Sequence, residues 1–269
     1  MTVPRILSIA GSDSGGGAGI QADIKTITML GGYAMTAITA ITAQNTLGVT
    51  EALPLPTATV LAQIDAVVSD IGLDAVKIGM IGSAETAVAV ADALARVPGG
   101  PELAIVFDPV MIATSGAVLA DQATISAFER LMQVAAVVTP NAPELEALSG
   151  LSVTTESEMK AAALALAGRY DVAVLAKGGH LGGDVLIDLL CFPDGRIHRW
   201  SAVRIETRHS HGTGCTLSSA IACLLGAGLS LQDAVSSARD YVRAALQAAP
   251  GLGRGHGPMG HNLGRSYFP

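Results

Sequence analysis

Apolar and polar residues alternate along the chain in two different ways. Short runs rich in Val, Ile and Ala predict β-strands at residues 5–11, 34–42, 74–80, 103–108, 135–140, 172–177 and 185–192. Longer segments with helical patterns predict helices near residues 19–31, 57–71, 83–97, 121–134, 156–169, 214–227 and 231–248. Strands and helices therefore follow one another along most of the chain.

Several expected strands are apolar throughout, which is typical of strands that helices cover on both faces of a parallel sheet. The pattern predicts an α/β fold, a three-layer α/β/α sandwich with a mostly parallel central sheet. No linker, repeat or low-complexity segment divides the sequence, so we expect residues 1–269 to form a single domain. The Gly-rich end, residues 251–269, is expected to be a loop.

Composition narrows the possible partners. Half of the 269 residues are hydrophobic but only 3% are aromatic, so we expect a core of small aliphatic side chains. The net charge of -7 offers no basic surface, and we expect no nucleic-acid partner. Charged residues make up only 14% of the chain, which indicates either a small surface or one partly covered by a partner subunit.

The cysteines and the apolar segments bear on location. Cys191, Cys215 and Cys223 are odd in number and form no C-x-x-C motif, so neither a disulfide framework nor a zinc site is expected. A reducing cytoplasm fits this usage best. The first apolar run is too short for a signal peptide, and no apolar stretch is long enough to span a bilayer. We expect a soluble cytoplasmic protein with no membrane partner.

Ligands of open α/β sheets bind at the carboxyl ends of the strands. The segment "GSDSGGGAGIQAD" (11–23) follows the first strand, and its glycines would let the backbone approach a ligand closely. It lacks the Gly-Lys-Ser/Thr end of a P-loop. It fits the loose dinucleotide fingerprint, but no acidic residue lies at the distance expected for ribose binding. A plain glycine-rich turn explains the segment equally well.

Three further strand ends carry candidate chemistry. In "TPNAPE" (139–144), Asn141 and Glu144 form a capping-box pattern, which this motif alone favours over a magnesium site. Asp108 ends another strand and could face either a metal ion or solvent. Lys177 precedes two glycines and could either neutralise a phosphate or be a solvated loop residue. Both interpretations stay open for each position.

The segment "HGTGCT" (211–216) is more informative. Gly212, Thr213, Gly214 and Cys215 place consecutive backbone N–H groups at the start of an apolar helix, where the helix dipole adds partial positive charge. Such a site suits the charge on a transferring γ-phosphoryl group. The same field is expected to lower the pKa of the Cys215 thiol. A structural helix start explains one glycine but not the whole set, so function is favoured.

Taken together, "GSDSGGGAGIQAD", "ITAQNT", "KIGM", "DPVM", "TPNAPE", "KGGH" and "HGTGCT" resemble the hydroxymethylpyrimidine/phosphomethylpyrimidine kinases of thiamine biosynthesis, in the ribokinase-like superfamily. The motifs occur in the family's order and span almost the whole chain. The resemblance implies phosphorylation of 4-amino-5-hydroxymethyl-2-methylpyrimidine to its monophosphate and then to its diphosphate. ATP and Mg²⁺ would serve both steps.

The resemblance also implies roles for single residues. Gln44 would hydrogen-bond the aminopyrimidine, since an amide offers both a donor and an acceptor. The other matches are Gly11, Asp23, Met80 and Val110 around the ring, Asp108 and Glu144 at the metal, Asn141, Lys177 and Thr213 at ATP and its phosphates, and Gly212 and Gly214 at the anion site. Cys215 would take the hydroxyl proton in the first step, whereas the second acceptor is already ionised.

The sequence departs from the family in two places, and alternatives remain. Thr114 and Ala117 stand where relatives often have Lys and Asp, and Arg208 and His209 where they often have Lys and Asn. The main alternative is a pyridoxal or pyridoxine kinase of the same superfamily. A non-catalytic ligand sensor and a nicotinamide oxidoreductase are further alternatives. The complete set of phosphate-site residues disfavours the sensor, and the missing ribose acid disfavours the oxidoreductase.

Overall fold

Strand β1 (Arg5–Asp13) lies inside a sheet with the order β3-β2-β1-β4-β5-β6-β7-β8-β9. The computed structural model describes residues 3–97, 102–113 and 116–264. The other strands are β2 (Tyr33–Asn45), β3 (Gly48–Pro54), β4 (Ala75–Ile78), β5 (Ala104–Phe107), β6 (Val137–Val138), β7 (Ala173–Lys177), β8 (Val185–Cys191) and β9 (Ile197–Val203). Strands β2, β1, β4, β5, β6 and β7 pair in parallel, while β3, β8 and β9 are antiparallel to their neighbours.

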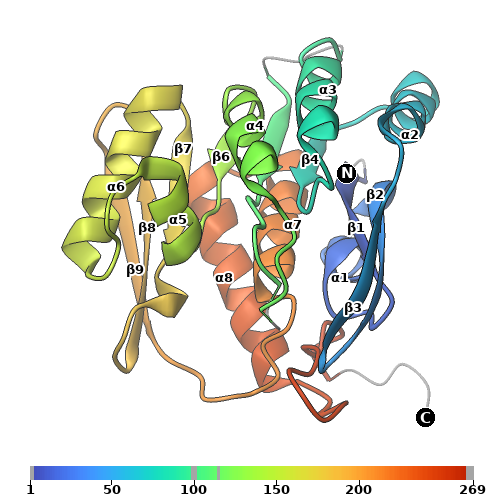
Figure 1. Cartoon of the computed structure of the whole chain (residues 1–269). Coiled ribbons are helices and arrows are strands. Elements are labelled where there is room, and N and C mark those ends of the chain that lie inside the picture. Colours follow the sequence, from blue (N-terminus) through green and yellow to red (C-terminus); the bar gives the residue numbers. More distant parts are fainter. Residues whose placement is uncertain (1–2, 98–101, 114–115, 265–269) are drawn as a thin grey trace.

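Helices cover both faces of this sheet (Figure 1). One face packs against α1 (Gly19–Met29), α7 (Thr213–Gly226) and α8 (Leu231–Gln247). The other packs against α2 (Thr57–Asp70), α3 (Ala84–Leu94), α4 (Gln122–Met132), α5 (Ala142–Ser149) and α6 (Glu156–Tyr170). The expected three-layer α/β/α sandwich with a mostly parallel sheet is confirmed.

The apolar strands supply both cores because successive side chains point to opposite faces. Ile6 packs toward α1 and α7, whereas its neighbour Leu7 packs into the core on the other face. Val137 and Val138 divide in the same way, so even the two-residue strand β6 contributes to both cores. Small aliphatic residues dominate both, as the composition predicts.

The seven expected strands and seven expected helices all occur, with shifted ends. The strand expected at residues 135–140 contracts to Val137–Val138. Strands β3 and β9 were not predicted, because they are edge strands with largely exposed residues and lack a continuous apolar run. Helix α5 was also missed, although its capping box was recognised.

The topology gathers the motifs at one edge of the sheet. Because β1, β4, β5, β6 and β7 run in parallel, their carboxyl ends lie on the same side, and α7 begins there (Figure 1). The segment 251–264 also returns to this edge: His256 N–H donates to Thr46 O (2.9 Å) beside the β2–β3 turn. His211 N–H donates to Gly257 O (3.2 Å) just before α7. Within the described ranges, no helix combines the length and apolarity needed to cross a membrane.

Candidate active site

A cavity of about 1460 Å³ opens at the carboxyl ends of the parallel strands. Its walls come from segments far apart in the chain, from Ala10 to Leu246. This volume exceeds the roughly 300–1,000 Å³ usual for one small ligand. The expected residues that line it are Gly11, Gln44, Met80, Asp108, Val110, Asn141, Glu144, Lys177, Gly212, Thr213, Gly214 and Cys215. The cavity therefore has room for two ligands side by side.

Asp23 is the exception among the expected site residues. Its side chain is fully buried below the cavity and does not line it. The carboxylate pairs with the fully buried Lys77 ammonium (Nζ–Oδ2 2.8 Å) and accepts hydrogen bonds from Ser8 and Ser219 (2.5 Å each). An unpaired buried ammonium would be strongly unfavourable, so Asp23 is committed to Lys77. Its expected place around the substrate ring is corrected to a place beneath the site.

The start of α7 forms the candidate anion site. Gly212 has φ +84° and is the N-cap, and no side chain caps this helix. A Cβ at Gly212 would lie 1.8 Å from Gly17 O, so only glycine fits where the two loops meet. The first backbone N–H groups of a helix have no partner within it, and here they face the cavity lining. The helix start can thus hold phosphate oxygens.

Cys215 lies in the first turn of α7 and is partly buried. Burial raises the pKa of its thiol to about 11, and Asp23 and Asp108 act in the same direction. The Lys77 ammonium and a hydrogen bond from Gly19 N–H oppose this shift without overcoming it. The prediction of a lowered pKa was therefore wrong. The helix dipole suggested a stabilised thiolate, but desolvation and two buried carboxylates outweigh it.

Lys177 lies opposite α7 at the end of β7. Its Nζ is 2.9 Å from Asp108 Oδ1 and 4.0 Å from Glu144 Oε2. Burial would lower the pKa of Lys177, but Asp108 and Glu144 together raise it, so the ammonium stays charged. A Cβ at Gly214 would lie 3.3 Å from Asp108 Oδ2 and 3.4 Å from Lys177 Nζ. The ion cluster and the anion site are therefore immediate neighbours, which excludes the solvated-loop interpretation of Lys177.

Asn141 and Glu144 form the expected capping box at the start of α5. Asn141 Oδ1 accepts from Glu144 N–H (3.0 Å), and Glu144 Oε2 accepts from Asn141 N–H (2.8 Å). Burial raises the pKa of Glu144 to about 7, Lys177 opposes the rise, and Asp108 adds to it. Both side chains also line the cavity. The cap and a place at the ligand site are thus compatible.

The chemistry of the donor set fits magnesium. No group of three or more His, Cys, Asp or Glu side chains suited to a metal occurs among the residues the structure describes. Mg²⁺ usually takes only one or two protein carboxylates and completes its shell with phosphate oxygens and water. Asp108 and Glu144, held beside Lys177, provide such a pair of oxygen ligands.

A second polar cluster, formed by Gln44, His211 and Asp13, also lines the cavity. Gln44 Nε2 is 3.3 Å from His211 Nε2, and His211 Nε2 is 2.9 Å from Asp13 Oδ2. Asp13 also accepts from the backbone N–H groups of Gly15, Gly17 and Ala18 (2.7, 3.0 and 2.9 Å). Although burial acts to raise its pKa, the hydrogen bonds from His211 and the backbone lower it, so Asp13 is a carboxylate.

Three residues of these clusters were not predicted from the sequence: Lys77, Asp13 and His211. The signal for Lys77 was a lysine inside the otherwise apolar strand "DAVKIGM". Asp13 and His211 lie within segments that were singled out for their glycines. Their pairing joins residues 198 positions apart, which no local pattern could indicate.

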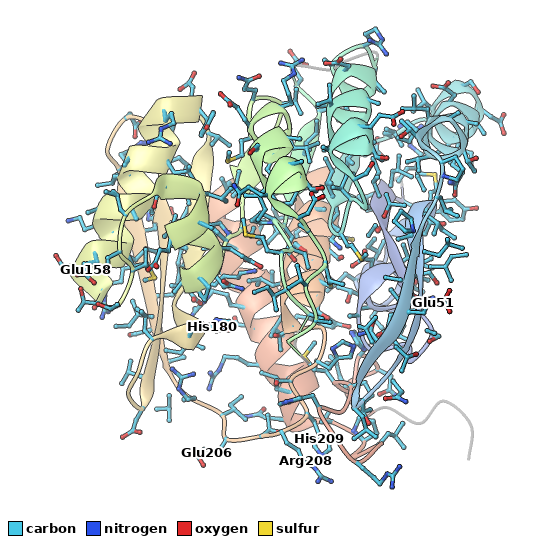
Figure 2. The ribbon with its side chains drawn as sticks, in the orientation of Figure 1. Glu51, Glu158, His180, Glu206, Arg208 and His209 are labelled. Atoms are coloured by element: carbon cyan, nitrogen blue, oxygen red, sulfur yellow. The ribbon has the colours of Figure 1, made fainter. Side chains whose placement is uncertain are left out.

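Of the positions that depart from the family pattern, Arg208 lies at the rim of the cavity. Figure 2 labels Glu206, Arg208 and His209 on the segment that leads to α7, and His180 on η1 (Gly178–His180). Arg208 is exposed and also lines the cavity, whereas His209 does not line it. Ala117 lies in the loop after β5. Thr114 lies outside the described residues.

Comparison with known proteins identifies the family of this chain. Residues 13–260 match the family described as Phosphomethylpyrimidine kinase. The hydroxymethylpyrimidine/phosphomethylpyrimidine kinase of Rhizobium meliloti is 51% identical over 259 residues, which cover 95% of this chain and 96% of that protein. The Thiamine biosynthesis bifunctional protein ThiED of Geobacter sulfurreducens is 48% identical over 96% of this chain. The chain spans only 52% of that longer protein.

Solved structures show the same fold. The pyridoxal kinase of Staphylococcus aureus in complex with ADP superimposes with a TM-score of 0.90 at 32% sequence identity. The match covers 99% of this chain and 96% of that one. The fold is thus shared with a pyridoxal kinase, so the fold alone does not identify the substrate.

Proposed function

Because this chain belongs to the phosphomethylpyrimidine kinase family, we propose that it is an ATP-dependent kinase of 4-amino-5-hydroxymethyl-2-methylpyrimidine. It transfers a phosphoryl group to the hydroxymethyl oxygen and then a second one to the resulting monophosphate. The product is the pyrimidine diphosphate used in thiamine diphosphate biosynthesis.

One observation carries this proposal: the uncapped start of α7 lies between the ion cluster and the amide of Gln44 in a single cavity. Gly214 is the link, since a Cβ there would contact both Asp108 and Lys177. Phosphoryl transfer depends on positioning the two oxygens in line and on stabilising charge between them. This arrangement puts cationic and N–H groups at the point where the γ-phosphoryl group passes.

The nucleotide phosphates lie against Lys177, the start of α7 and Asn141. Lys177 neutralises them as a point charge, and the N–H groups of Gly214 and Cys215 hold the transferring group. The backbone and hydroxyl of Thr213 border the same phosphates. Mg²⁺, held by Asp108 and Glu144, would neutralise further phosphate charge when bound. The pyridoxal kinase relative was solved with ADP, which supports ATP as the phosphoryl donor.

The pyrimidine lies beside Gln44, on the side of the start of α7 that faces away from Lys177. Gln44 binds its polar edge, and Gly11, Met80 and Val110 border the ring. A Cβ at Gly11 would lie 3.0 Å from Met80 Sδ, so glycine leaves more room for the ring at this point. We expect the hydroxymethyl group to lie near Cys215, between the residues that border the ring and those that border the phosphates.

Cys215 takes the hydroxyl proton in the first step. Its thiol receives a hydrogen bond from Gly19 N–H and lies in the field of Lys77, so a thiolate formed there is stabilised on two sides. The pKa of about 11 means that the thiolate is a minor form at neutral pH. In a loose transition state the proton can leave late, so a base of this strength suffices. The second step has an ionised acceptor and needs no base.

We also propose that the chain forms a single domain, assembles as a homodimer and acts in the cytoplasm. Residues 1–269 act as one domain, because the cavity draws its walls from both ends of the chain. A homodimer would cover exposed apolar residues on the β2–β3 edge, among them Ile41 and Leu53. A cytoplasmic location suits a catalytic thiol. Sedimentation velocity of the purified chain tests the dimer.

An ADP-release assay tests the function. Mg-ATP is supplied with the hydroxymethylpyrimidine or with pyridoxal at equal concentrations, and kcat/KM is measured for each. We expect the pyrimidine to be the better substrate by at least about tenfold, which corresponds to one matched hydrogen bond. A preference for pyridoxal would overturn the substrate while keeping phosphoryl transfer.

A further inference from the structure

The cluster formed by Gln44, Thr42, His211 and Asp13 determines which way the Gln44 amide faces. Four contacts define it: Thr42 Oγ1 lies 3.0 Å from Ser12 O and 3.1 Å from Gln44 Oε1, while His211 Nε2 lies 3.3 Å from Gln44 Nε2 and 2.9 Å from Asp13 Oδ2. A rotation of the amide by 180° exchanges its oxygen and nitrogen within the same space. The hydrogen-bond network therefore decides between the two orientations.

The protonation of His211 determines which amide atom of Gln44 faces it. Asp13 is a carboxylate that accepts three backbone N–H groups and is only 2% exposed, so it offers His211 an acceptor and no proton. His211 Nε2 must then carry a hydrogen and donate it to Asp13. An N–H group cannot accept from the amide nitrogen of Gln44. The amide atom that faces His211 with a favourable contact is therefore the oxygen, which shares the His211 hydrogen with Asp13.

Thr42 contacts the other end of the Gln44 amide. A hydroxyl has one hydrogen, and Thr42 Oγ1 can donate it to Ser12 O. Its lone pairs then remain to accept from an amide N–H. The same rotation of Gln44 thus satisfies both ends: Nε2 donates to Thr42, and Oε1 accepts from His211. The backbone is held too, since Ser14 Oγ accepts from Gln44 N–H (2.8 Å) and donates to Gln44 O (2.8 Å).

We propose that His211, anchored by Asp13, is a specificity-determining residue that fixes Gln44 with Oε1 toward His211 and Nε2 toward Thr42, and so sets the orientation of the pyrimidine ring. This inference rests on the proposed function and deepens it. The ring presents a donor, its 4-amino group, beside an acceptor, its N3. The amino group binds Oε1 on the His211 side, and N3 accepts from Nε2 on the Thr42 side.

This orientation of the ring directs the hydroxymethyl group toward the start of α7. On the ring, the hydroxymethyl carbon is attached next to the carbon that bears the amino group. With the amino group on the His211 side, the hydroxymethyl group lies toward Gly212 and Cys215, which follow His211 in the chain. The opposite amide orientation would turn the hydroxymethyl group away from the start of α7. Pyridoxal carries a formyl oxygen beside its hydroxymethyl group, which would face Gln44 Oε1 as acceptor against acceptor.

A pair of ring compounds tests this orientation. The amino compound is compared with its 4-oxo analogue, 5-hydroxymethyl-2-methylpyrimidin-4-one, in which N3–H is a donor and O4 an acceptor. Both kcat/KM and the dissociation constant without ATP, by calorimetry, are measured. We expect the wild-type protein to favour the amino compound by about tenfold to hundredfold, since two hydrogen bonds are reversed. A preference for the oxo analogue would overturn the proposed orientation.

Variants separate this role from a structural one. In His211→Met the amide loses the N–H that orients it, and the preference should fall to within about threefold. His211→Gln can donate one hydrogen to Asp13 and the other to Gln44, and should restore the wild-type preference. His209→Met is the matched control, because His209 does not line the cavity, and should keep it. If His211→Met weakens both compounds equally, His211 only supports the loop and the proposal is wrong.

A second variant covers the case in which His211→Met does not fold. Thr42→Val keeps the side-chain shape but removes the acceptor for Gln44 Nε2, so the preference should fall about threefold to tenfold. An unchanged preference in Thr42→Val contradicts the proposal. If the wild-type protein binds the amino compound over the oxo analogue but phosphorylates neither, the proposed function fails while the orientation stands.

Discussion

Lys77 Nζ lies 2.8 Å from Asp23 Oδ2, and both side chains are completely shielded from solvent. Lys77 comes from β4 and Asp23 from α1, while Ser8 of β1 and Ser219 of α7 donate to the same carboxylate. One ion pair and two hydrogen bonds thus join four elements beneath the cavity. The pair explains why a lysine occurs inside an otherwise apolar strand.

Breaking this pair from one side should be strongly destabilising. We expect Lys77→Met to lower the free energy of unfolding by about 3–5 kcal/mol, because it leaves the Asp23 carboxylate buried without a counter-ion. The double variant Lys77→Met/Asp23→Leu should recover a large part of the loss. Urea unfolding followed by circular dichroism measures both. A loss below about 1 kcal/mol in the single variant would show that the pair is not buried as described.

Gly212 should tolerate no side chain. With φ +84° and a Cβ position 1.8 Å from Gly17 O, Gly212→Ala must displace the loop or the start of α7. We expect a loss of more than about 2 kcal/mol in unfolding free energy and of more than about a hundredfold in kcat. Gly168→Ala is the control, because that glycine lies in α6 with nothing within 4 Å of its Cβ position. It should be neutral or stabilising by up to about 1 kcal/mol.

Cys215 should matter for one of the two steps. Cys215→Ala should slow phosphorylation of the hydroxymethyl compound by about 10²–10⁴-fold, as expected for loss of a base, and phosphorylation of the monophosphate by less than about tenfold. Separate assays with each pyrimidine as the acceptor measure the two rates. Equal slowing of both steps would rule out the role of a base.

The pKa of that thiol also predicts a pH dependence. Because the pKa of Cys215 is about 11, the thiolate fraction grows with pH over the whole neutral range. The rate of the first step should rise by up to about tenfold per pH unit between pH 7 and 9. The second step should stay nearly flat. The alanine variant is the control, since its residual first-step activity should lose the slope.

His261 gives a prediction for stability rather than rate. His261 is buried, and its Nε2 lies 3.0 Å from Oγ1 of Thr216 in the first turns of α7. Burial lowers its pKa to about 4 from 6.5, and Lys25 acts in the same direction, so the folded chain binds fewer protons than the unfolded chain between these values. Neutral His261 therefore contributes to the free energy of unfolding above pH 6.5, and this contribution is lost as the pH falls toward 4.

We therefore compare urea unfolding of the wild-type chain and His261→Gln at pH 7 and pH 4.5. The wild-type chain should lose about 1–3 kcal/mol more than the variant over this interval. Parallel losses in both would mean that His261 is already protonated in the folded chain at pH 4.5 or is open to solvent.

Much of the fold could be predicted because the central strands and their helices have strong local patterns. The apolar runs around Ile6, Val76 and Val174 are buried on both faces and leave no polar alternation to misread. The edge strands β3 and β9 differ, since pairing on one side determines them more than their own residues do. The prediction of α5 failed although Asn141 and Glu144 marked its start, because eight residues give little helical period.

The site divides along a similar line. The positions of Gly212, Lys177 and Asp108 could be predicted because each lies at the end or the start of an identifiable element, where parallel strands have their carboxyl ends. Asp23 could not be placed, since its partner Lys77 is 54 residues away. The pKa of Cys215 was mispredicted because a local dipole is visible in sequence, whereas burial and the carboxylates of Asp23 and Asp108 are not.

Phosphorus NMR of one reaction tests the central claim most directly. The purified chain is mixed with the hydroxymethylpyrimidine and an excess of Mg-ATP, and the phosphorus signals are followed to completion. The account predicts that a monophosphate signal appears first and then gives way to a diphosphate, with two ADP formed per pyrimidine. A reaction that stops at the monophosphate with one ADP, or that leaves the pyrimidine unchanged, would contradict it.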